Sequence, residues 1–134
     1  MSYEPNQYEV TNVSRLRPSD RYSYLLQKVV DWQEVWSIRF PDGWVLYADD
    51  KGQQLVPVWP ARAFAEACCT NEWAECTVEM IPLSEWLSAW IPGMIRDGRA
   101  VAAFPLPDDR GMIVEPKRMA TDLRETELQY VDDK

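Results

Sequence analysis

One stretch in the middle of the chain, residues 42–70, limits the possible folds more than any other. It reads DGWVLYADDKGQQLVPVWPARAFAEACCT, with short apolar runs on both sides of the polar turn sequence DDKG. This pattern predicts two antiparallel strands joined by a tight turn, and Pro60 suits the first turn of a following helix. Pro57 has no amide hydrogen for a strand ladder, so we expect its end of the second strand at a sheet edge or a bulge.

The segments on both sides extend this unit into an α+β fold. Apolar residues three and four positions apart predict an amphipathic helix over residues 20–33. The helix that starts at Ser84 is expected to bend or break at Pro92-Gly93 and to end at Gly98. The order α-β-β-β-α-β-α-β-β-α predicts a single mixed, mainly antiparallel sheet of five to six strands with about four helices. The strands are expected at residues 35–40, 43–48, 53–59, 76–81, 100–104 and 112–115, and the other helices from residues 60 and 116.

The 134 residues form one domain by length. Residues 1–18 are polar and rich in proline and asparagine, which indicates a flexible N-terminal arm that docks only through Tyr3, Tyr8 or Val10. A single α+β domain is therefore predicted over residues 19–131. The apolar content of 46% is enough for one packed core.

Net charge narrows the classes of partner. The chain has 14 basic and 22 acidic residues, a net charge of −8, which repels phosphate backbones and anionic lipid. The composition therefore predicts no binding to nucleic acid or membranes and favours a basic protein as a partner. Such a charge also keeps proteins soluble without any partner, and this is its commoner role.

Cysteine usage and the N-terminal sequence indicate a cytoplasmic protein. Cys68, Cys69 and Cys76 form no disulfide framework, because their number is odd and two of them are neighbours. The first ten residues lack the basic and then apolar pattern of a signal peptide. No apolar run approaches the ~20 residues that a membrane span needs.

The residue types that most often carry out chemistry are scarce. Histidine is absent, which removes the Ser-His-Asp and Cys-His arrangements and the commonest metal ligand. A closed zinc site needs four Cys or His ligands, more than the three cysteines supply. The five glycines are isolated, so there is no glycine-rich phosphate loop. The sequence therefore predicts no catalytic residue, no metal and no cofactor, and a protein that is not an enzyme.

The densest acidic group consists of Asp42, Asp49 and Asp50. Each lies in or beside a predicted turn, where aspartate is favoured because its side chain accepts backbone hydrogen bonds. The run lacks the alternating oxygen ligands of a calcium loop. Turn formation is the commoner role, and Asp49 and Asp50 are also the candidate acidic contact for a basic partner.

Tryptophan is unusually frequent, with seven residues. Trp86 and Trp90 lie on the apolar face of a predicted helix and are expected in the core. Trp44, Trp59 and Trp73 lie near chain reversals, where an exposed indole would be a hot spot for a protein partner. Burial as an anchor of the core is the alternative for these three.

Four runs of sequence carry a resemblance to a known family. They are RYSYLLQKVVDWQEVWSI, DGWVLYADDKGQQLVPVWP followed by AFAEAC, IPLSEWLSAWIPGMIRDG and VAAFPLP. Over roughly residues 21–130 the chain resembles a small bacterial family of unknown function, and the block LYxDDxGxxLxPVWP is the most specific part of the likeness. A strand–proline–strand order late in the chain is also distantly similar to SseB-type domains. The family resemblance implies a small bacterial cytoplasmic α+β protein and brings no catalytic residues.

Three hypotheses about function follow. The first is a non-catalytic protein-binding module, of the immunity or regulatory partner type. The second is a small-ligand-binding domain with a pocket between the sheet and the Trp86/Trp90 helix. The third, an enzyme that uses carboxylates alone, led by Asp49 and Asp50, ranks last. An edge strand near Pro57 would also permit a homodimer.

Overall fold

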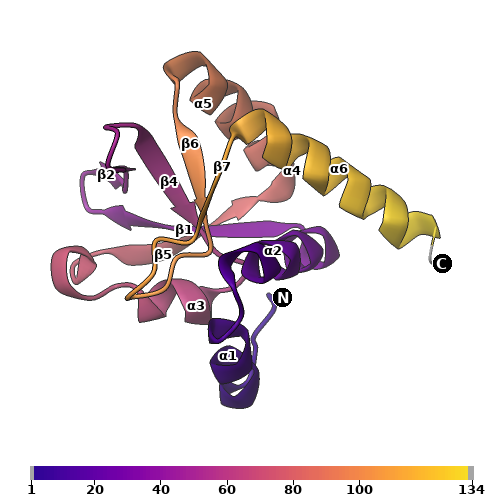
Figure 1. The fold of residues 1–134 in the computed structure, drawn as a ribbon, viewed down its shortest axis with the longest axis horizontal. Helices are drawn as coiled ribbons and strands as arrows, with labels where there is room; N and C mark the ends of the chain where they lie inside the picture. The colour runs from indigo at the N-terminus through magenta and orange to yellow at the C-terminus, as the bar shows by residue number, and fades with distance from the viewer. Residues whose placement is uncertain (1, 133–134) are drawn as a thin grey trace.

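The structure is a computed structural model that describes residues 2–132, with helices packed around two sheets (Figure 1). The helices are α1 (Gln7–Ser14), α2 (Pro18–Trp32), α3 (Arg62–Ala67), α4 (Leu83–Glu85), α5 (Ile91–Asp97) and α6 (Pro116–Asp132), with a 3₁₀ turn η1 (Asn71–Trp73) and a π-helical turn η2 (Trp86–Trp90). The strands are β1 (Glu34–Phe40), β2 (Gly43–Trp44), β3 (Tyr47–Ala48), β4 (Gln54–Val58), β5 (Thr77–Pro82), β6 (Ala100–Ala103) and β7 (Met112–Val114).

The strands of the two sheets run across one another in Figure 1. Strands β2, β1 and β5 form an antiparallel sheet, and β3, β4, β6 and β7 form a second sheet in that order. Within the second sheet β4 and β6 are parallel, while the other neighbours are antiparallel. The predicted α+β class with mixed, mainly antiparallel pairing is confirmed, and the predicted single sheet is wrong.

Pro57 explains why β1 and β4 do not join the sheets into one. The two strands exchange one pair of hydrogen bonds, between Trp36 and Trp59, with N–O distances of 3.0 and 2.8 Å. The next hydrogen-bonded pair in this register would set Ile38 opposite Pro57, which has no amide hydrogen to donate. The Pro57 carbonyl instead accepts a hydrogen bond from the Ser37 hydroxyl at 2.7 Å. Pro57 thus lies in a central strand, between β3 and β6, and ends the ladder on the side that faces β1.

The predicted strand 43–48 is divided between the two sheets. Its first half, β2, pairs with β1, and its second half, β3, pairs with β4. Between them the buried Val45 donates its amide to the carbonyl of Ile38 at 3.1 Å. The chain therefore passes from one sheet to the other within two residues. The sequence pattern does not show where the chain changes from one sheet to the other, because β2 and β3 both need apolar residues.

The long helices supply much of the core between and above the sheets. The helix predicted over residues 20–33 is confirmed as α2, which buries Leu25 and Val29 completely. Helix α6 packs against α2 and α5 and buries Met119 and Leu123, and its far end extends away from the sheets in Figure 1. Within residues 2–132 no helix is long and apolar enough to cross a membrane.

The helix predicted from Ser84 begins one residue earlier and continues through η2 into α5. Pro92 cannot donate to the helix, and its ring would clash with the carbonyl four residues before it. The turn before Pro92 therefore widens, and the amide of Ile91 bonds to the carbonyl of Trp86, five residues back. The expected interruption is thus a π-helical turn. Gly98 ends the helix as predicted, with a left-handed φ of 70°.

Residues 2–18 hold more structure than the flexible arm predicted from sequence. Helix α1 lies within this segment, and the Asn6 side chain caps it by accepting from the Glu9 amide at 2.8 Å. The hydroxyls of Tyr3 and Tyr24 are 2.6 Å apart, which docks the segment on α2. Of the other expected contacts, Val10 packs against the core while Tyr8 is exposed.

Candidate functional site

A cleft of about 570 Å³ opens beside β3, at one end of the four-stranded sheet. Tyr47 and Ala48 of β3, Cys68 and residues 70–73 around η1, and residues 105–110 between β6 and β7 form its walls. We call it the η1 cleft. Its volume is in the range of known ligand sites.

Two aromatic rings form one wall of the η1 cleft. The rings of Tyr47 and Trp73 are 5.3 Å apart between centroids and meet at 64°, an edge-to-face arrangement. Burial raises the pKa of the Tyr47 phenol to about 12, so the ring carries no charge at neutral pH. Turn η1 begins at Asn71 with a left-handed φ of 53°, a conformation that asparagine tolerates better than most residues. This turn places the half-buried indole of Trp73 against the cleft.

A buried arginine fixes the loop that forms another wall. Arg21 of α2 is 1% exposed and donates to the carbonyls of Phe104 at 3.1 Å and Leu16 at 2.7 Å. Its Nη2 is 3.2 Å from the Asp109 carboxylate, an ion pair whose angle falls short of a well-aligned hydrogen bond. Asp109 also accepts from the Gly111 amide at 2.7 Å. These contacts tie both ends of the loop to α2 and compensate the buried charge of Arg21.

The backbone of the same loop needs a glycine. Gly111 has a left-handed φ of 78°, and a Cβ atom at this position would lie 2.3 Å from the carbonyl oxygen of Ala103. No other residue fits there without a shift of the backbone. Gly111 thus allows the end of the loop to pack closely against the end of β6, while Arg21 ties the loop to α2.

Negative charge exceeds positive charge along the walls of the cleft. Three carboxylates, those of Glu72, Asp108 and Asp109, line it against one guanidinium, that of Arg110. Arg110 Nη1 is 2.9 Å from the carboxylate of Asp50, and Asp109 is paired as described above. Within residues 2–132, Glu72 and Asp108 form no ion pair. Two uncompensated carboxylates beside two aromatic rings favour a cation over an anion in this cleft.

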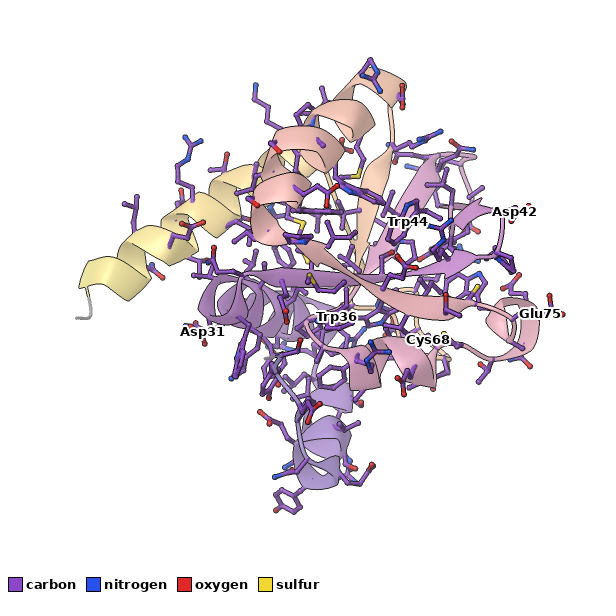
Figure 2. The ribbon with its side chains drawn as sticks, turned by 180° about the vertical axis from the view of Figure 1, so that it is seen from behind. Asp31, Trp36, Asp42, Trp44, Cys68 and Glu75 are labelled. Atoms are coloured by element: carbon purple, nitrogen blue, oxygen red, sulfur yellow. The ribbon has the colours of Figure 1, made fainter. Side chains whose placement is uncertain are left out.

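The predicted acidic contacts have different positions. Asp50 borders the cleft through the ion pair just described, whereas Asp49 Oδ1 accepts hydrogen bonds from the amides of Lys51 and Gln53, both at 2.9 Å. Asp49 thus closes its own turn, which is the commoner of the two roles expected for it. Asp42 lies at the end of the β1–β2 hairpin in Figure 2.

The three tryptophans expected at the surface have three different environments. Trp73 lines the η1 cleft. Trp59 is fully buried and donates from Nε1 to the carbonyl of Pro105 at 2.8 Å, so the expectation of an exposed indole there is wrong. It supports the cleft loop from inside. Trp44 lies elsewhere, in a second cavity of about 280 Å³, with its ring 4.9 Å from that of Trp90.

The Cys68 thiol at the base of the cleft lacks the lowered pKa of a reactive cysteine. Burial raises the pKa of the Cys68 thiol to about 12, and its Sγ is 3.4 Å from the carbonyl of Pro105. The pKa values of Cys69 and Cys76 are also raised, by burial first. Protonated thiols are poor nucleophiles and poor metal ligands. Among the residues that the structure describes, no cluster of three or more His, Cys, Asp or Glu side chains is arranged to hold a metal ion.

Sequence reasoning missed Arg21 and Tyr47 as parts of the site. Arg21 is four residues before Leu25, on the face of α2 that the apolar residues bury. A charged residue on a buried face needs a partner, and this signal could have singled it out. Tyr47 follows the ordinary alternation of a strand, so no pattern marks it. Asp108 and Asp109 precede Gly111 in a turn-rich sequence, where aspartate is common for its backbone hydrogen bonds and does not by itself mark a site.

A protein-family model matches the chain. It is described as a protein of unknown function, DUF2750, and it covers residues 22–123. No curated protein and no solved structure matches. The likeness to SseB-type domains, the bacterial origin and the cytoplasmic location stay predictions.

Proposed function

The chain belongs to the DUF2750 family of proteins of unknown function, and we propose that it is a non-catalytic binding domain whose η1 cleft receives a basic segment of a partner protein. The observation that carries the proposal is the combination of the Tyr47–Trp73 wall with the uncompensated carboxylates of Glu72 and Asp108. Such a combination recognises a lysine or arginine side chain, whose alkyl stem packs on the rings and whose charge meets the acids.

The contacts around the cleft favour a rigid binding surface. Arg21, Trp59 and Gly111 fix the loop from inside, so binding would not have to order it first. A half-buried tryptophan at the centre of such a surface is a typical hot spot. The net charge of −8 would steer a basic partner toward the protein, and this attraction weakens as salt rises. An acidic domain that occupies a basic site of another protein would act as an immunity or regulatory partner.

The proposal is tested by affinity purification from the native cells at low and moderate salt, with matched variants of the tagged protein. The cleft variants are Trp73→Ala and the double substitution Glu72→Gln/Asp108→Asn. The control is Asp31→Asn/Glu85→Gln, which removes the same charge elsewhere on the surface. Figure 2 shows Asp31 and Glu75, which follows η1, on opposite sides of the molecule.

We expect a basic protein that is retained at low salt, lost at moderate salt and bound about tenfold more weakly by each cleft variant. The control should bind as tightly as the unchanged protein. A lysine-rich peptide, compared with its fully acetylated form, measures the same preference with purified components. Equal loss of binding in the cleft and control variants would mean that net charge alone attracts the partner, and the proposed role of the cleft would be wrong.

A small-ligand-binding domain is the second candidate, favoured by the cavity of about 280 Å³ that Trp44 and Trp90 share. It lies between the strands and α5, where a pocket beside the Trp86/Trp90 helix is expected. A thermal-shift screen of metabolites tests it. The carboxylate-only enzyme has no comparable support, because Asp49 is engaged in its own turn and Asp50 pairs with Arg110. The homodimer stays a prediction.

A further inference from the structure

The cavity around Trp44 is a separate and chemically different site. It lies between β2, β4 and the helix η2–α5, and Trp44, labelled in Figure 2, is a residue of β2. We call it the Trp44 pocket, and its walls include Trp44, Leu46, Val56, Trp90, Gly93 and Met94. It shares no lining residue with the η1 cleft. Ligand binding in this pocket rests on the second candidate function, the small-ligand-binding domain, and not on a basic partner.

Two indoles shape the apolar part of the Trp44 pocket. The rings of Trp44 and Trp90 meet edge to face at 89°, and Trp90 stacks on the fully buried Trp86 at 5.7 Å. Trp86 and Trp90 are the first and last residues of the π-helical turn that precedes Pro92. Such widened turns occur frequently at functional sites. Here the turn allows the indole of Trp86 to pack in the core and that of Trp90 to line the pocket.

A helical glycine, Gly93, forms part of the pocket wall. Gly93 lies within the helix run that ends at Gly98, without the left-handed φ that would require glycine. A Cβ atom at Gly93 would have only Arg96 Nη2 within 4 Å, at 3.7 Å, so the space beside it is empty. Glycine inside a helix costs about 1 kcal/mol relative to alanine. A Cβ atom therefore fits at Gly93, whereas a larger side chain would extend into the pocket.

The rim of the pocket is basic, although the chain as a whole is acidic. Arg96 and Arg99 line it with one acid, Asp97, whose carboxylate is 3.3 Å from Arg96 and 3.5 Å from Arg99. A third guanidinium, that of Arg39, lies 5.4 Å from the centroid of the Trp44 ring. Arg99 also donates from Nε to the Gln54 side chain at 3.0 Å, which orients its guanidinium. Two cations against one carboxylate at the rim, with Arg39 close to the Trp44 ring, favour an anionic ligand.

We propose that the Trp44 pocket binds a small aromatic carboxylate, with its ring against Trp44 and Trp90 and its carboxylate at Arg96 and Arg99. The volume of about 280 Å³ suits a molecule with one ring. The apolar walls exclude a ligand that is polar throughout, because its groups would lose hydrogen bonds to water. The basic rim disfavours cations, which separates this site from the η1 cleft.

The proposal is tested with three single-ring probes of different charge on the full chain: phenylacetate, phenylacetamide and phenethylamine. The indole N–H resonances of Trp44, Trp90 and Trp73 report on the pocket and on the cleft during an NMR titration. We expect phenylacetate to shift Trp44 and Trp90 but not Trp73, and to bind about tenfold more tightly than the neutral amide. The amine should bind more weakly than both.

Substitutions in the pocket wall test whether the ligand needs the space of the pocket, and substitutions at the rim test whether it needs the positive charge. Gly93→Leu fills the pocket and should abolish binding, whereas Gly93→Ala should retain it. Arg99→Gln should weaken phenylacetate about tenfold and leave phenylacetamide unchanged, and Arg17→Gln, on the exposed start of α2, should change neither. If Gly93→Leu does not fold, Arg99→Gln still gives the decisive comparison.

Several results would overturn the proposal. One is the absence of any shift of Trp44 and Trp90 at millimolar phenylacetate. Equal affinity for the acid and the amide would show that charge has no role, and binding that survives in a folded Gly93→Leu variant would place the ligand elsewhere. None of these results bears on the η1 cleft, which is tested by its own variants.

Discussion

The η1 cleft and the Trp44 pocket are two sites of opposite character in one small domain. Loops form the cleft, and its walls are polar and acidic. Strands and a helix form most of the pocket, which is apolar with a basic rim. The cleft needs a buried arginine to hold its loop in place, whereas the pocket is held by packing of the tryptophans. The difference shows that a loop site depends on few specific contacts, and a site between regular elements depends on the core.

Arg21→Met should have the largest effect. It should disrupt the η1 cleft and leave the Trp44 pocket unchanged. The substitution removes a buried charge with three partners and leaves the carbonyls of Phe104 and Leu16 without their donor. We expect a loss of about 3 kcal/mol in the free energy of unfolding, measured by urea denaturation. The indole resonance of Trp73 should shift, and that of Trp44 should not.

The control for this prediction is Arg17→Met, at an exposed ion pair with Asp20. It should change the free energy of unfolding by less than about 0.5 kcal/mol. If both variants are equally stable, or if Trp44 shifts as much as Trp73, the two sites are not supported independently.

Gly111→Ala should have the next largest effect, again on the cleft. A Cβ atom at this position meets the carbonyl of Ala103 at 2.3 Å, and the left-handed φ adds strain. We expect a loss of about 2 kcal/mol, measured by thermal denaturation. Gly52→Ala is the matched control, because Gly52 also has a left-handed φ but nothing within 4 Å, and it should lose only about 1 kcal/mol. Equal losses would mean that the contact with Ala103 relaxes without cost.

Gly93→Ala should have a smaller effect of opposite sign, and on the pocket side. Alanine suits a helix better than glycine, so we expect a gain of about 0.5–1 kcal/mol in the free energy of unfolding. Gly98→Ala is the contrast, because the left-handed φ of 70° at the end of the helix should make it destabilising. A destabilised Gly93→Ala variant would show that the space beside Gly93 is not free for a Cβ atom.

Substitution of Cys68, at the base of the cleft, should have the smallest effect on stability at neutral pH. Its pKa is raised from 9.0 to about 12 by burial, so the folded state favours the protonated thiol. The stability that this gives is complete below about pH 9 and is lost as the pH rises toward the folded-state pKa. Urea denaturation from about pH 8 to pH 11 should show a decline that begins earlier in the unchanged protein than in Cys68→Ala. A decline of the same size and onset in both would exclude Cys68 as its source.

Local patterns were sufficient to predict most elements and a part of the sites. The apolar spacing of α2, the left-handed end of the helix at Gly98 and the all-buried β6 follow from residues close in the sequence. Trp73 and Asp50 were candidates because they lie near turns. Trp73 lines the η1 cleft, and Asp50 pairs with Arg110 of the cleft wall. The environments of Trp44 and Trp59 could not be distinguished, because both lie in similar apolar runs beside turns.

The sequence by itself determined the elements, the excess of acid and the scarcity of catalytic side chains, since these depend on composition and short-range spacing. It also contained Pro57, whose missing amide hydrogen interrupts the ladder between β1 and β4. Only the tertiary structure decided that two sheets form, that Arg21 reaches Asp109 and that Trp44 meets Trp90. These contacts join residues far apart in the chain, and their geometry depends on how the packed elements cross one another, which no local pattern encodes.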